Sequence, residues 1–173
     1  MLNAFTSEFE RYRRIGERSI GQVSDEALNW MPVPEGNSLG MIVRHLSGNL
    51  TSRFTDLLTT DGEKPWRNRE AEFEERDYSR AEVEQLWGEG WSVLDTALQE
   101  LTDEQLQDTV TIRGQAWTIQ AALARSLAHL AHHVGQMVLI ARIVQGDAWE
   151  WISIPRGCSE AYNQNPTKER VPG

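Results

Sequence analysis

Apolar residues recur every three or four positions in four long segments of the chain, and this spacing predicts four amphipathic helices. In a helix such positions lie on one face, which can pack into a common core. We expect the first helix over about 2–19 and the second over about 37–59. The third begins after Ser79, which with Glu82 has the form of a capping box. The fourth and longest covers about 118–144.

The segments between these helices indicate the type of bundle. The charged stretch 66–77, between the second and third helices, is long for a bundle connection and predicts a crossover along the molecule. β-Branched residues alternate over 109–113, and a second short run follows at 116–118, which predicts a small hairpin. The fold class is therefore all-α: a four-helix bundle with a long crossover between helices two and three and a β-hairpin before the last helix.

The length of the chain suits one such bundle. At 173 residues it can bury most of its apolar surface in a single core. We expect residues 1–148 to form the bundle and residues 149–173, which are rich in Pro, Asn and Gly, to form a C-terminal extension. Trp149 and Trp151 would hold the first half of the extension on the bundle, and the end beyond Asn165 is expected to be loose.

The charge of the chain bears on its partners. Its formal net charge is -9, from 26 acidic and 17 basic side chains. Binding to duplex nucleic acid or to an anionic membrane depends on clustered Lys and Arg, so we expect neither partner. The first residues lack the pattern of a signal peptide, and no run approaches ~18 consecutive apolar residues. We expect a cytoplasmic protein that does not span a membrane.

The histidines are the strongest candidate for chemistry. The chain has 4 His. Three of them are His129, His132 and His133, and the fourth is His45 in the second predicted helix. His129 and His133 are four residues apart, so both leave the same helix face. Neutral imidazole is the commonest ligand for zinc-like metals, and Cys158, a single cysteine, excludes a thiolate cluster. If helices two and four face each other, His45 would complete a three-histidine site. The same spacing also fits histidines that pack beside an apolar face.

Several neighbouring residues are candidates for supporting roles. His132 diverges by roughly 100° from His133 around the helix, which places it on a shoulder of the site or on the surface. Asn49 and Gln136 could orient the imidazoles or simply join helices by hydrogen bonds. Arg53, two turns beyond His45, could hold an anionic substrate or pack at the rim of the core. The acidic residues between Glu70 and Asp77 are interpreted as a solvated loop.

Two motifs of the chain resemble a known superfamily. The pattern His-x-x-x-His-x-Gly-Gln at 129–136, together with the histidine element at 42–49, resembles the DinB-like (YfiT-like) superfamily of metal-binding four-helix bundles. The likeness covers about 2–145. Four further segments resemble an uncharacterised branch of it: 49–54, 60–66, 112–114 and 153–157.

The resemblance implies a site on His45, His129 and His133, filled by zinc or nickel, in a protein that is often a homodimer. It further implies a small-molecule substrate, because characterised members include transferases that use low-molecular-weight thiols. Other members have been described as metal-dependent hydrolases. Hydrolysis usually needs a base beside the metal, and no obvious carboxylate lies near either motif, so we favour a thiol-dependent transferase. The alternatives are a metal-dependent hydrolase and a non-catalytic metal-binding or dimeric interaction protein.

Overall fold

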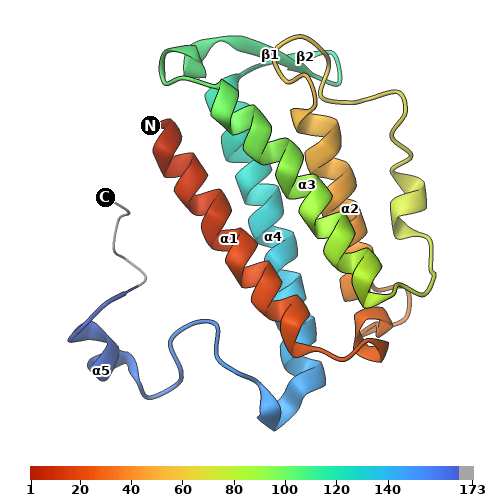
Figure 1. Ribbon diagram of the computed structural model, residues 1–173, viewed down its shortest axis with the longest axis vertical. Helices are drawn as coiled ribbons and strands as arrows, with labels where there is room; N and C mark the ends of the chain where they lie inside the picture. Colours follow the sequence, from red (N-terminus) through yellow and green to blue (C-terminus); the bar gives the residue numbers. More distant parts are fainter. Residues whose placement is uncertain (168–173) are drawn as a thin grey trace.

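The computed structural model describes residues 1–167, and this part of the chain is built on four long helices (Figure 1). The helices are α1 (Leu2–Gln22), α2 (Leu39–Phe54), α3 (Arg80–Glu100) and α4 (Ile119–Gln145). α2 packs mainly on α3 and α1 mainly on α4, while α2 and α4 also touch. The all-α four-helix bundle expected from the sequence is confirmed.

The direction of the helices explains the long connection between α2 and α3. Both run toward the same end of the bundle, so the chain must return along the outside before α3 begins (Figure 1). This crossover carries a short 3-10 helix, η2 (Glu70–Phe73), which packs against α2. The predicted crossover is confirmed, and it places η2 beside the second helix.

Local sequence chemistry sets the beginnings of three helices. Ser38, Ser79 and Thr118 each accept a hydrogen bond from the backbone N–H three residues later. Such N-caps satisfy amides that have no partner within the helix. The Ser79 cap is the predicted one, although the Glu82 side chain pairs with Arg76.

Two helix ends differ from the expected boundaries. α1 continues past Ser19 to Gln22, with Gly21 inside the helix and not at its end. α2 ends at Phe54 and not near Thr59. The next residue is extended, and Asp56 has a positive φ of 49°, a conformation that an α-helix cannot continue through.

The predicted hairpin is present as β1 (Thr109–Ile112) and β2 (Gln115–Thr118), which pair antiparallel. Its two turn residues, Arg113 and Gly114, both have positive φ, as tight hairpin turns of the primed type require. The hairpin lies over the end of the bundle where α2 ends (Figure 1).

The first residues of the C-terminal segment contact α1 and α4. Arg18 donates to the Trp151 carbonyl, and the Arg142 guanidinium lies 4.5 Å from the centre of the Trp151 ring. A short helix, α5 (Ser159–Asn163), forms within the segment expected to be a C-terminal extension. The expected loose end beyond Asn165 falls mostly on residues outside the described part, and the division at residue 148 stays a prediction.

One described segment, Ile119–Ala148, is long and apolar enough to cross a membrane by length and composition. These two properties do not separate a membrane span from a bundle helix. In the fold, α4 packs its apolar face against α1 and α2, with Leu123, Leu130 and Met137 fully buried.

Candidate metal centre

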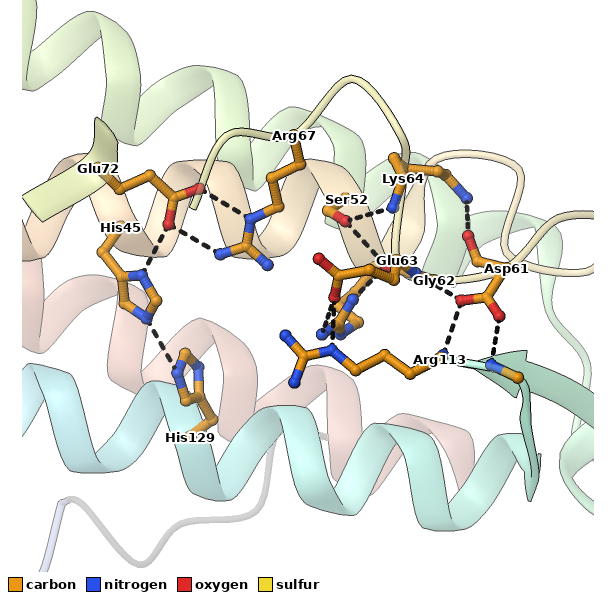
Figure 2. Close-up of polar contacts among 12 residues, drawn as sticks. His45, Ser52, Asp61, Gly62, Glu63, Lys64, Arg67, Glu72, Arg113 and His129 are labelled. Atoms are coloured by element: carbon orange, nitrogen blue, oxygen red, sulfur yellow. Dashed lines mark hydrogen bonds and ion pairs between the residues drawn. The ribbon is translucent and has the colours of Figure 1, made fainter. Parts of the chain in front are cut away.

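Three histidines from two helices meet between α2 and α4. His45 comes from α2, and His129 and His133 come from α4; their ligand nitrogens all lie within 4.8 Å of one another. The Nε2 atoms of His45 and His129 are 3.2 Å apart, and Figure 2 shows the two rings pointing toward each other. Two nitrogens bound tetrahedrally to one zinc at ~2.1 Å are about 3.4 Å apart. The three histidines predicted from the sequence are therefore close enough to bind one metal ion.

His132 lies outside this cluster, as its position on the helix predicted. It is exposed, and its Nε2 accepts a hydrogen bond from the Gln136 amide at 3.3 Å. The same Gln136 accepts from His133 Nδ1 at 2.8 Å. Gln136 thus orients the His133 ring through Nδ1. Its supporting role at a metal site stays a prediction.

A carboxylate from the crossover orients His45. His45 Nδ1 lies 2.8 Å from Oε2 of Glu72, in the short helix η2. Since a carboxylate is an acceptor, the neutral His45 ring carries its proton on Nδ1 and directs the Nε2 lone pair at the other histidines. The expectation that no carboxylate lies near the histidine motifs was wrong. The linker was interpreted as solvated, and Glu72, at 5% exposure, is the exception among its acidic residues.

Glu72 is held as an anion by a second partner. Arg67 donates from Nε and Nη2 to the two carboxylate oxygens, each at 2.8 Å (Figure 2). Burial alone would raise the pKa of the Glu72 carboxyl, but the hydrogen bonds from His45 and Arg67 outweigh it and hold the pKa below its usual value. Arg67, Glu72 and His45 thus form a buried series of hydrogen bonds, and Nε2 of His45 lies at the candidate metal position. Such carboxylate–histidine pairs are common behind metal ligands.

Gly48 allows the crossover to approach α2 this closely. A Cβ at this position would overlap the Glu72 carboxylate. A glycine within a helix costs about 0.5–1 kcal/mol relative to alanine, so it usually has a packing reason. Gly48 follows His45 by three residues and is the local signal in the sequence that could have indicated the contact.

We predict that Gly48→Ala weakens both the fold and metal binding. The new methyl group must displace Glu72 and release His45, so we expect a loss of about 1–3 kcal/mol in the free energy of unfolding and a weaker metal affinity. The measurements are urea denaturation and chelator competition. Gly88→Ala is the matched control: it lies within α3 with nothing near its Cβ, and it should stabilise by up to about 1 kcal/mol. Equal effects of the two substitutions would contradict the prediction.

The environment keeps the two α4 histidines neutral. Burial, together with the neighbouring His133 and His45, lowers the pKa of His129 to about 3. Burial likewise lowers the pKa of His133 to about 4, although its bond to Gln136 opposes the shift. Metal ligation needs the unprotonated imidazole, so both rings are ready to bind at neutral pH.

A second polar cluster ties the loop after α2 to the hairpin. The Asp61 carboxylate accepts from the backbone N–H groups of Arg113 and Gly114 at 2.8 and 2.7 Å. Arg53 pairs with the Gly62 carbonyl and with Glu63. The sequence had suggested Arg53 as a substrate contact; the structure shows it anchored to this loop with part of its side chain on the cavity wall.

The histidines open onto a cavity of about 420 Å³ between α2, α4, the crossover and the hairpin turn. All of the residues suggested from the sequence lie on its wall: His45, Asn49, Arg53, His129, His132, His133 and Gln136. Small-molecule sites occupy ~300–1,000 Å³, so the cavity suits a small ligand. It also has arginines that were not singled out from the sequence, among them Arg113 and Arg125.

The model of one protein family, described as "Protein of unknown function (DUF1572)", matches residues 1–158. No curated protein and no solved structure matches the chain. Because the family match covers more than half of the sequence, the protein belongs to the DUF1572 family.

Proposed function

We propose that the protein is a metal-dependent enzyme of the DinB-like superfamily, most simply a thiol-dependent transferase, with zinc or nickel held by His45, His129 and His133. The observation that carries the proposal is the convergence of three imidazoles from α2 and α4 at the wall of a small-molecule cavity. Three protein ligands leave a divalent metal at least one further coordination position, which is typical of catalytic sites.

When bound, a divalent metal lowers the pKa of a coordinated thiol or water and so supplies a nucleophile at neutral pH. The protein's own residues prepare the site for it. Glu72 and Gln136 fix two of the rings through their Nδ1 atoms and leave Nε2 for ligation. The cavity wall holds the second reactant close to the histidines, which lowers the entropic cost of bringing two molecules together.

The position of Glu72 supports thiol transfer over hydrolysis. A hydrolase usually needs a base at the open coordination position. Glu72 contacts His45 at Nδ1, the ring nitrogen directed away from His129, and both of its oxygens are bound by Arg67. No aspartate or glutamate is among the described residues that line the cavity. A thiol that loses its proton on binding needs no such base.

Cobalt substitution tests whether the site has an exchangeable position. We expect cobalt(II)-loaded protein to develop sulfur-to-cobalt charge-transfer absorption on addition of 3-mercaptopropan-1-ol. The protein should also accelerate conjugation of that thiol to 1-chloro-2,4-dinitrobenzene over the metal-free protein. A metal-loaded protein whose spectrum no thiol changes would favour the non-catalytic alternative. Ester hydrolysis in the absence of thiol would favour the hydrolase if His132→Ala abolished it. In that case His132, which lies on the cavity wall, would act as the base.

A further inference from the structure

The wall of the cavity is strongly cationic although the protein is acidic. The sequence has 15 arginines, and five of those in residues 1–167 line this one cavity. They are Arg53, Arg67, Arg69, Arg113 and Arg125. The described residues of the wall include no carboxylate, whereas the whole chain has a formal net charge of -9. Gathering like charges in one place is unfavourable unless anions compensate them.

Four of these arginines pair with a carboxylate of the protein, and two of the four, Arg53 and Arg113, share Glu63. Arg67 is bound on two nitrogens by Glu72. Arg53 pairs with Glu63 at 3.0 Å, and Arg69 pairs with the exposed Glu70 at 3.1 Å. These ion pairs give Arg53, Arg67 and Arg69 a structural role.

Arg113 and Arg125 keep donors for a ligand. Arg113 binds Glu63 through Nε at 2.8 Å, on the same oxygen that Arg53 uses. Figure 2 shows its guanidinium extending past Glu63 along α4, toward the side where His45 and His129 lie. Arg125 lies over the Trp117 ring at 5.6 Å, and within the described part of the chain no carboxylate forms an ion pair with it.

Arg125 also has a defined position relative to the histidines. Arg125, His129 and His133 are spaced four residues apart on α4, so they lie along one face of the helix. At ~1.5 Å of rise per residue, Arg125 is about 6 Å along the helix axis from His129. A short molecule can therefore reach the arginine with one end and the histidine cluster with the other.

We propose that Arg125 and Arg113 bind an anionic group of the substrate, a carboxylate or a phosphate, while the substrate's thiol end reaches the three histidines. A guanidinium presents paired donors that match both kinds of oxyanion. This inference rests on the proposed function and names its substrate class: a small anionic thiol.

Two thiols that differ only at the distal group test the inference. On cobalt-loaded protein, 3-mercaptopropionate should bind at least about 10-fold more tightly than 3-mercaptopropan-1-ol, since hydrogen bonds between charged groups are stronger than those between neutral groups. Arg125→Gln should remove most of this preference and leave the affinity for the alcohol unchanged. Arg113→Gln should reduce it as well. Arg14→Gln, an equal charge change on the exposed face of α1, should leave it intact.

The outcomes separate this inference from the proposed function. Equal affinities for the two thiols, or a preference that survives both arginine substitutions, would overturn the anion site and leave the metal site in place. If neither thiol changes the cobalt spectrum, the proposed function fails. In that case the anion site is tested by calorimetric titration of metal-free protein with succinate. Binding of succinate that Arg125→Gln abolishes supports the anion site, and the absence of binding refutes it. Competition by inorganic phosphate or by acetate against 3-mercaptopropionate identifies the preferred oxyanion.

Discussion

His45→Ala is expected to abolish stoichiometric metal binding. His45 is the one ligand that α2 supplies, so its loss leaves two imidazoles on α4 and opens the site toward the crossover. Loss of an orienting partner alone costs about 10–100-fold in metal affinity, and loss of a ligand should cost more. We expect wild-type protein to retain about one zinc or nickel per chain after dialysis, measured by elemental analysis, and the variant to retain almost none.

His132→Ala is the matched control for this experiment. It removes an imidazole next to the site that is exposed and bound to Gln136. This variant should keep the wild-type metal content, and His129→Ala and His133→Ala should behave as His45→Ala does. Thermal unfolding gives a second measurement, because a metal at 1,000 times its Kd stabilises the native state by about 4 kcal/mol. Full metal content in the His45→Ala protein would refute the site.

Glu72→Ala should produce the largest loss of stability among single substitutions at the site. The Arg67 side chain is only 3% exposed, and the substitution would leave this buried cation without its carboxylate. Breaking a buried ion pair by removing one partner typically costs about 3–5 kcal/mol. Since His45 loses its hydrogen-bond acceptor as well, metal affinity should fall by about 10–100-fold. Urea denaturation of metal-free protein and chelator competition measure the two effects.

The neighbouring Glu70 provides the control. It lies in the same short helix, and its side chain is 88% exposed, so Glu70→Ala should change the free energy of unfolding by no more than about 0.5 kcal/mol. Replacing the pair together, Arg67→Met with Glu72→Leu, should recover much of the stability but not the metal affinity. Unchanged stability in Glu72→Ala would contradict the buried pair, and recovered metal affinity in the double variant would contradict the orienting role.

The correct expectations for this chain depend mostly on residues that are close together in the sequence. The Ser79 cap, the hairpin and the shared face of His129 and His133 were predicted, because each depends on residues within a few positions of one another. The end of α2 was misplaced by five residues, from 59 to 54, because a left-handed Asp56 overrode the apolar spacing. Glu72 was assigned to solvent because its sequence neighbours are charged, and those neighbours are indeed exposed.

The four helices, the crossover and the histidines that share a face could be predicted from local patterns, since helical periodicity alone aligns residues four apart. The packing of η2 on α2, the contact of Glu72 with His45 and the five arginines around one cavity are visible only in the folded protein. Contacts within the site join residues that are distant in the sequence; His45 and His129, for example, are 84 positions apart. The contact between Glu72 and His45 depends on the path of the crossover and on Gly48, which has no side chain to block Glu72. No periodic pattern in the sequence predicts this path.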